Sequence, residues 1–153
     1  CELYNKVYDL PTAICRFYNV YGEHQLEEGA YATVIGIFQK QHREGKSLTV
    51  TGDGEQRRDF THIDDIVDGI VRCGLNLLGD NPIASGQAYE LGRGLNFSIN
   101  EITEMFGETE VEYIPARKGE YPFTLADYTK AKEELGWNPS MSVKDYINMA
   151  VSK

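Results

Sequence analysis

Apolar residues recur along the chain at the three- and four-residue spacing that is typical of amphipathic helices. This spacing predicts two long helices. We expect the first to end near Gly45 and the second at the Gly79–Pro82 break. The predicted buried faces are Tyr31, Val34, Ile35 and Phe38 in the first helix, and Ile66, Val67, Ile70, Val71, Leu77 and Leu78 in the second.

Four shorter helices are predicted from capping and stop signals. Leu10-Pro11 ends a helix over Glu2–Tyr8, and Gly136 ends another over Asp127–Leu135. Ser98 and Glu101 form a capping-box pattern, and Ser142 starts the last helix. We expect the Ser98 helix to bury Ile99, Ile102, Met105 and Phe106 and to stop at Gly107, and the last helix to bury Val143, Tyr146, Ile147 and Ala150.

Short runs of β-branched and apolar residues predict strands between these helices. Because strands and helices alternate, the sequence predicts the α/β fold class. The predicted strands are Thr12–Tyr18, which is typical of a buried strand, Leu48–Thr51, Arg58–Ile63, Ala88–Leu91 and Val111–Ile114.

Length and charge narrow the classes of partner. The 153 residues suffice for one domain with a real core, and no segment approaches the roughly 20 apolar residues that span a bilayer. The first ten residues lack the order of a signal peptide, so we expect a cytoplasmic protein. The net charge of −9 argues against nucleic acid or an anionic membrane as the main partner.

The cysteines and histidines show no metal-binding or redox motif. Cys1, Cys15 and Cys73 are widely spaced, without a CxxC pair, and the histidines lack zinc spacing. An odd number of cysteines without a framework favours a reducing compartment. We therefore expect buried or incidental thiols and no metal site.

The usual enzyme signatures are missing, which leaves a set of anion-competent side chains. No G-x-G-x-x-G, P-loop or G-x-S-x-G is present. Arg57, Arg58, Arg93 and Arg117 lie in or beside glycine-containing turns, where a guanidinium can bind a phosphate or pair with an acid such as Asp59 or Glu120. Asn19 ends a predicted strand, and its amide can face a ligand or bond local backbone.

Six segments, in order, resemble motifs of the extended short-chain dehydrogenases, the NAD-dependent nucleotide-sugar epimerases and dehydratases. The resemblance runs from about Thr12 to the end of the chain. The segments are Arg16–Gly22 (R-x-x-N-V-Y-G), Gly52–Phe60 (G-D-G-x-x-x-R-D-F), Tyr89–Gly94 with the Ser98 helix (N-x-G-x-G…S), Arg117–Glu120 (R-x-G-D), Ala126–Ala131 (A-D-x-x-K-A) and Leu135–Pro139 (L-G-W-x-P).

The resemblance implies which part of such an enzyme is present. In this family the glycine-rich NAD loop, the catalytic Ser/Thr and the Y-x-x-x-K pair precede the first of these motifs. It therefore implies the C-terminal substrate-binding portion of an extended Rossmann-type epimerase, with short mixed strands and helices, no catalytic residues, and the NAD-binding N-terminal half absent. Residues 1–153 would form a single substrate-binding domain, in which 1–22 and parts of 58–94 would pack on the missing Rossmann sheet. The exposed edges would favour self-association.

The resemblance also implies roles for individual residues. Asn19 would contact the diphosphate or sugar of a nucleotide sugar, while Arg58 and Arg117 would clamp the diphosphate from two sides. Glu120 stands where the family often uses Asp for ribose hydroxyls. Val34, Thr49, Thr51 and Ile99 would surround the nucleobase and ribose, and Phe17 and Tyr18 would lie near the nicotinamide of NAD.

Three positions depart from the family pattern. Glu23 replaces Pro, Glu90 replaces Asn and Glu120 replaces Asp; Glu90 would add negative charge close to the phosphate site. We expect the nucleotide-sugar-binding portion of an NAD-dependent epimerase or dehydratase, not catalytically competent alone and binding no NAD by itself. The alternative is a non-catalytic assembly or binding module that reuses this fold.

Overall fold

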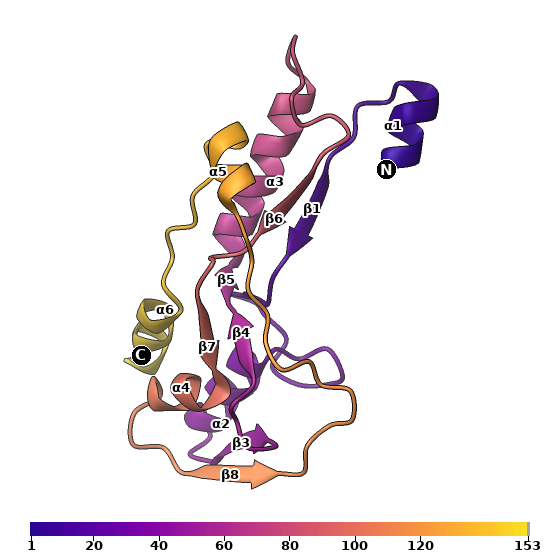
Figure 1. The fold of residues 1–153 in the computed structure, drawn as a ribbon. Coiled ribbons are helices and arrows are strands. Elements are labelled where there is room, and N and C mark those ends of the chain that lie inside the picture. The colour runs from indigo at the N-terminus through magenta and orange to yellow at the C-terminus, as the bar shows by residue number, and fades with distance from the viewer. Residues whose placement is uncertain (153) are drawn as a thin grey trace.

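The computed structural model describes residues 1–152 and has an elongated shape with two lobes (Figure 1). The β1–β6 lobe contains α1, β1, α3, β6 and α5, the cavity lobe contains α2, β3, β8, α4 and α6, and β2, β4, β5 and β7 lie between them. The elements are α1 (Glu2–Tyr8), β1 (Ile14–Phe17), β2 (Val20–Tyr21), α2 (Val34–Arg43), β3 (Leu48–Thr51), β4 (Arg57–Asp59), β5 (Thr61–His62), α3 (Ile63–Leu77), β6 (Ala88–Leu91), β7 (Asn96–Ser98), α4 (Ile99–Glu104), β8 (Val111–Ile114), α5 (Thr129–Leu135) and α6 (Val143–Val151).

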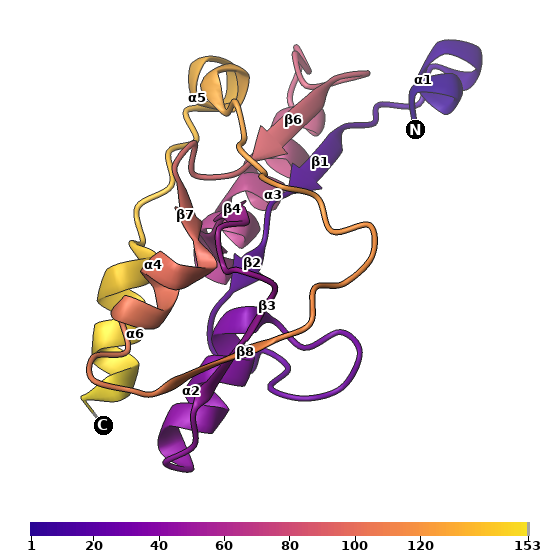
Figure 2. The same cartoon turned by 60° about the horizontal axis from the view of Figure 1, so that its bottom comes forward.

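The strands of the described residues pair in four two-stranded sheets. β1 pairs with β6, β2 with β5 and β3 with β8, all in parallel, whereas β4 and β7 are antiparallel. Figure 2 shows β3 and β8 side by side across α2. Parallel pairs need long crossover connections, so each joins segments far apart in the sequence. The α/β fold class predicted from the sequence is confirmed.

The cavity lobe has the larger core. The ring of Phe38 from α2 meets Phe106 edge-on, with centroids 5.9 Å apart. Helix α6 closes the core with Ile147, which is fully buried. The buried residues are Tyr21, Ile35, Phe38, Leu48, Val50, Phe60, Ile99, Ile102, Phe106, Val143, Tyr146 and Ile147.

The β1–β6 lobe has a smaller core around Trp137. This indole is fully buried, packs edge-on against Tyr128, and donates a hydrogen bond from Nε1 to the carbonyl of Asp65 at 2.8 Å. The carboxylate of Asp65 accepts from the backbone of Ser140 and Met141, which holds the segment before α6 in place. The buried residues are Ile66, Cys73, Ala84, Tyr89, Leu91, Ala131 and Trp137.

The signals for helix ends are confirmed. Ser98 and Glu101 make both hydrogen bonds of a capping box, and Gly136 adopts the left-handed conformation after α5. Helix α2 begins at Val34 because Thr33 is extended and its hydroxyl accepts from the amide of Gly36. The prediction that Tyr31 lies on the buried face of this helix is therefore wrong: Tyr31 precedes the cap and is 88% exposed.

The helix α3 is confirmed, but only part of its predicted apolar face is buried: Ile66 is buried and Leu77 packs against the smaller core. Its inner face is centred on Gly69, where an added Cβ would lie 2.7 Å from Leu91 Cδ1. Because the backbone approaches β6 at this glycine, the face that packs carries Ile66 and Cys73, with a glycine between them. The side chains of Val67, Ile70, Val71 and Leu78 point outward and are 43–86% exposed.

Four other predictions need smaller corrections. The first strand is partly exposed rather than buried, because β1 has one neighbouring strand and Arg16 and Phe17 lie outside the packed face. The strand predicted at Arg58–Ile63 is split into β4 and β5, and Ile63 already belongs to α3. Helix α5 starts at Thr129, two residues later than predicted. The side chain of Ala150, which was predicted to be buried, is only partly buried.

A buried carboxylate joins the two lobes. Asp59, at the end of β4, is fully buried and accepts hydrogen bonds from the amides of Arg93 and Gly94, both at 2.8 Å, and of Ala126 at 3.0 Å. The two backbone segments are tightly packed there, since an added Cβ on Gly92 would lie 2.3 Å from Ala126 Cβ. Because successive side chains of a strand point to opposite sides, Arg58 faces away from this joint.

Candidate functional site

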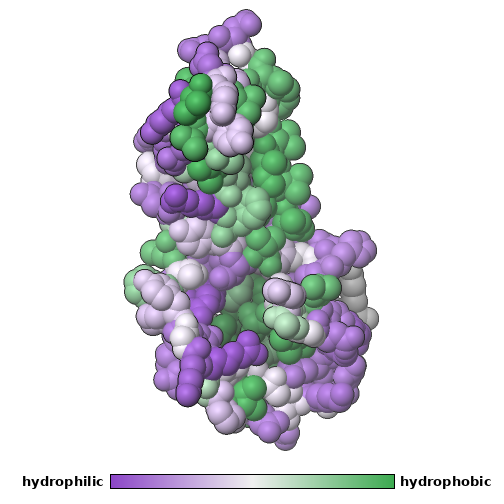
Figure 3. Space-filling model, turned by 90° about the vertical axis from the view of Figure 1, so that its right-hand side faces the viewer, coloured by the Kyte–Doolittle hydropathy of each residue, from purple (hydrophilic) through white to green (hydrophobic). Residues whose placement is uncertain are grey.

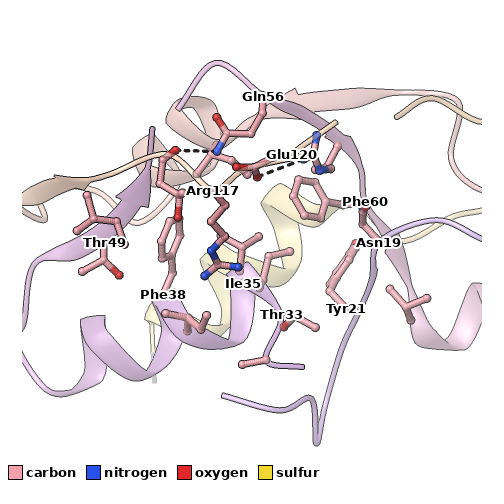
Figure 4. A pocket seen from close by; sticks show the side chains of 18 residues that line it. Asn19, Tyr21, Thr33, Ile35, Phe38, Thr49, Gln56, Phe60, Arg117 and Glu120 are labelled. Atoms are coloured by element: carbon pink, nitrogen blue, oxygen red, sulfur yellow. Dashed lines mark hydrogen bonds and ion pairs between the residues drawn. The ribbon is translucent and has the colours of Figure 1, made fainter. Parts of the chain in front are cut away.

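The main cavity of the described residues has a volume of about 350 Å³ and lies in the cavity lobe, beside α2 and next to the strands that lead to the other lobe. Figure 4 shows its lining side chains, which come from the start of β2, the N-terminal part of α2, β3, β4 and the loop after β8. These segments are far apart in the sequence, so the cavity exists only because β3 pairs with β8 and β2 with β5.

All of the residues that the sequence analysis assigned to the substrate line this cavity. They come from four of the six motif segments or from elements next to them. They are Asn19, Val34, Thr49, Thr51, Arg58, Ile99, Arg117 and Glu120.

Two guanidinium groups give the cavity a positive face. Figure 4 shows Arg117 projecting into the cavity from the loop after β8. Arg58 enters from β4, with only 16% of its side chain exposed, and its Nη1 donates to the Arg57 carbonyl at 2.9 Å. Two forked donors held around one space suit an anion with several oxygens.

Glu120 supplies a carboxylate within the same cavity. Its Oε1 lies 3.3 Å from Arg58 Nη2, and 31% of its side chain is exposed. Of the two alternatives that the sequence left open for Arg58, pairing with an acid is observed, and phosphate binding stays a prediction for a residue that lines the cavity. An anionic ligand that reaches Arg58 has to compete with Glu120.

The other two candidate arginines are engaged elsewhere. Arg57 pairs with Glu101 at 2.8 Å, and its Nε donates to Asn96 Oδ1 at 2.9 Å. Arg93 donates to the Met141 carbonyl, and neither arginine lines the cavity. Of the two neighbouring arginines, Arg58 lines the cavity and Arg57 does not.

The remaining walls combine polar groups with apolar surface. Gln56 is held by a 3.0 Å hydrogen bond from its Nε2 to the Thr51 carbonyl, which leaves its Oε1 as an acceptor on the wall. Thr49 is held by Gln41, which donates to its hydroxyl at 2.8 Å. The sequence analysis did not assign Tyr21, Thr33, Ile35, Phe38, Gln56, Phe60 or Ile114 to the site.

One signal in the sequence points to part of this missed set. Val34 was assigned to the site, and Phe38 lies one helical turn after it on the same face. Gln56 and Phe60 lie two positions before and after Arg58, so the alternation of side chains along an extended strand places them on the same face as Arg58.

The two residues assigned to the cofactor lie outside the cavity. Phe17 is 51% exposed at the end of β1, and Tyr18 follows it. Partial burial, and after it the hydrogen bond and charge of Glu90, raises the pKa of Tyr18. Glu90 itself accepts from the amide of Asp127 at 2.8 Å and contributes no side chain to the cavity wall.

Glu23 is the third departure from the family pattern. Its carboxylate lies 3.4 Å from Nε2 of His62, which is buried. Nδ1 of His62 accepts from the amide of Asp64, so Nε2 carries the proton and faces Glu23. Glu23, where the family pattern has Pro, therefore adds a charge beside β5 rather than within the cavity.

With this geometry in hand, the chain can be compared with known proteins. A family model described as "GDP-mannose 4,6 dehydratase" matches residues 1–150. The UDP-glucose 4-epimerase of Mycolicibacterium smegmatis is 33% identical over 155 residues, which cover 98% of this chain and 47% of that protein.

Two solved structures show the same arrangement. The UDP-glucose 4-epimerase of Thermotoga maritima, determined with UDP-glucose, superposes with a TM-score of 0.82 at 32% identity, covering 99% of this chain and 48% of that one. The UDP-glucuronic acid 4-epimerase of Bacillus cereus, in complex with UDP-glucuronic acid and NAD, has a TM-score of 0.82 at 30% identity, with coverages of 99% and 48%.

The chain belongs to the family that this model describes, and it corresponds to the C-terminal part of the epimerases and dehydratases that it matches. It spans about half the length of the curated relatives it matches. Among residues 1–152, no helix has the length and apolar character needed to cross a membrane.

Proposed function

We propose that this chain binds the nucleoside diphosphate part of a nucleotide sugar within an NAD-dependent epimerase or dehydratase. The observation that carries the proposal is the cavity in which Arg58 and Arg117 face one space beside Asn19 and Glu120. Two of the related structures were determined with UDP-glucose or UDP-glucuronic acid, which supports the same class of ligand.

Each wall of the cavity has a role in this proposal. Arg58 and Arg117 grip the diphosphate from two sides, and Asn19 contacts the diphosphate or the sugar. Glu120 leaves Arg58 and accepts from the ribose hydroxyls, while Val34, Thr49, Thr51 and Ile99 enclose the base and ribose. Binding energy from these remote groups holds the sugar in position for reaction.

The residues present do not make up a dinucleotide site. The sequence has no glycine-rich strand–turn–helix fingerprint, and Phe17 and Tyr18 provide only a half-exposed edge. We therefore derive no hydride-transfer step through this chain. In the proposal, other residues of the intact enzyme hold NAD, and this chain alone is not catalytically competent.

Isothermal titration with UDP-, GDP-, ADP- and dTDP-sugars tests the binding role. We expect binding of at least one of them, and its loss in Arg58→Ala. Arg43→Ala is the matched control, because Arg43 pairs with Glu27 on the surface and lies outside the cavity. Equal losses in the two variants, or none in Arg58→Ala, would contradict the proposed site.

Turnover separates the binding role from catalysis. The chain mixed with NAD and each nucleotide sugar should form no epimerised or dehydrated product in a chromatographic assay. Product formation that co-elutes with the chain during purification would show that the chain is catalytically competent alone.

A second candidate function is a non-catalytic assembly or binding module. The exposed apolar residues of α1 and α3 favour it, because they offer a surface for another polypeptide. Failure to bind any nucleotide sugar, together with concentration-dependent association of the chain, would favour this candidate over the first.

A further inference from the structure

Two cysteines that are far apart in the sequence meet in the β1–β6 lobe. The Sγ atoms of Cys15 on β1 and Cys73 on α3 lie 3.5 Å apart, although 58 positions separate the residues. Cys73 is buried and Cys15 is partly exposed, and both are free thiols. The contact arises because α3 packs on β1 through the face that carries Cys73.

The two thiols differ in a way that suits sequential oxidation. The hydrogen bond from Cys73 lowers the pKa of Cys15 to about 7, and the same interaction raises the pKa of Cys73. At neutral pH the more accessible sulfur is thus partly thiolate, while the buried sulfur keeps its proton. The thiolate is the form that reacts with peroxides and disulfides.

We propose that Cys15 and Cys73 form an oxidation site that reacts with a hydroperoxide and stores the two oxidising equivalents as an intramolecular disulfide. The sulfurs need to approach from 3.5 Å to about 2.0 Å, a movement that a side-chain rotation and a small shift of α3 on β1 can supply. The site is independent of the cavity and of the proposed binding function.

The chemistry proceeds in two balanced steps. The Cys15 thiolate attacks the peroxide, the O–O bond breaks, and with one proton taken up this gives Cys15 sulfenic acid and the first water. The Cys73 sulfur then attacks the sulfenic sulfur, the S–O bond breaks, and the departing hydroxide takes the Cys73 proton to form the second water. In total, two thiols and one hydrogen peroxide give one disulfide and two waters.

Mass spectrometry of the whole chain tests this directly. The measurement uses a Cys1→Ser background, because Cys1 is exposed and reacts on its own. After treatment with hydrogen peroxide we expect a loss of about two mass units, a Cys15–Cys73 linked peptide under non-reducing conditions, and recovery with dithiothreitol.

Two variants of the same background identify the reacting sulfur. In Cys73→Ala, Cys15 should accumulate as sulfenic acid, detected by dimedone labelling, because its resolving partner is gone. In Cys15→Ala, Cys73 should react at least tenfold more slowly than Cys15 in the background protein. Oxidation of Cys15 to sulfinic acid without the linked peptide in the background protein would overturn the proposal, whether or not either variant folds.

Discussion

The two lobes contain similar elements but differ in how completely they bury them. The cavity lobe encloses twelve buried apolar side chains between α2, α4 and α6, whereas the β1–β6 lobe encloses seven and leaves much of α1 and α3 uncovered. The cavity lobe has the features of a self-sufficient core, and the β1–β6 lobe those of one layer that needs another. The comparison separates the part of the chain that builds a site from the part that offers a surface.

The uncovered surface is apolar and continuous with the open edge of β1. Figure 3 shows apolar residues gathered along the upper part of the molecule, over the β1–β6 lobe. We propose that the dinucleotide-binding part of the intact enzyme, or a second copy of this chain, covers it. The exposed apolar residues include Leu3, Tyr4, Val7, Tyr8, Leu10, Phe17, Val67, Ile70, Val71, Leu75 and Leu78.

The largest effect is expected where the lobes are joined. Asp59→Ala leaves three amides without their acceptor, one of them buried, and removes a fully buried carboxylate, so we expect a loss of about 3–5 kcal/mol in the free energy of unfolding. Asp53→Ala is the matched control, because Asp53 is exposed and its carboxylate accepts a hydrogen bond from the amide of Glu55. Urea denaturation measures both. Equal losses would show that the joint does not depend on Asp59.

A pair of isoleucine substitutions compares the lobes themselves. Ile147→Ala removes a fully buried side chain from the cavity lobe and should cost about 2–4 kcal/mol in urea denaturation. Ile70→Ala on α3 removes a 43% exposed side chain and should cost less than about 1 kcal/mol. Similar costs would mean that the outer face of α3 is already buried in solution.

Within the cavity, Glu120→Gln removes the carboxylate that competes for Arg58. We expect inorganic pyrophosphate to bind a few-fold more tightly, since an ion pair of this exposure contributes about 1 kcal/mol or less. Titration calorimetry compares it with Glu28→Gln, which removes a surface charge paired with Lys40.

The two probes separate this competition from the proposed function. A nucleoside diphosphate should gain less than pyrophosphate from Glu120→Gln, because it loses the acceptor for its ribose. If pyrophosphate binding is unchanged or weaker, Glu120 does not compete for Arg58. If no variant binds either probe, the binding function itself fails.

The smallest effect on stability is expected on the outer face of α3. Ile70→Gln with Val71→Gln should change the free energy of unfolding by less than about 1 kcal/mol, because both side chains are 43–50% exposed. The same double substitution should reduce self-association, measured by sedimentation velocity over a range of concentrations. A parent chain that stays monomeric at the highest concentration would contradict self-association through this surface.

Much of the candidate site could be predicted because the motifs of this sequence resemble those of a known family. The resemblance implied Asn19, Arg58, Arg117 and Glu120; Arg58 lies in β4, and the other three lie in loops. Gln56 and Phe60 were missed although they flank Arg58 at the two-residue spacing of a strand face.

Helix α3 shows the same limit for the fold. Its length and ends follow from periodicity and from the break after Leu77, which are local properties. Its buried face does not, because hydropathy favours the valines and isoleucines, whereas the close approach of β6 requires a glycine at position 69.

The sequence by itself determined the α/β class and several helix caps, because these depend on neighbours a few positions apart. Its likeness to the family motifs implied the residues assigned to the cavity. Only the tertiary structure decided that Asp59 joins the lobes, that Arg58 is shared between the cavity and Glu120, and that Cys15 meets Cys73. Each of these contacts joins two segments that are at least 30 residues apart in the sequence. The packing of α3, β6 and β8 decides whether the two segments meet.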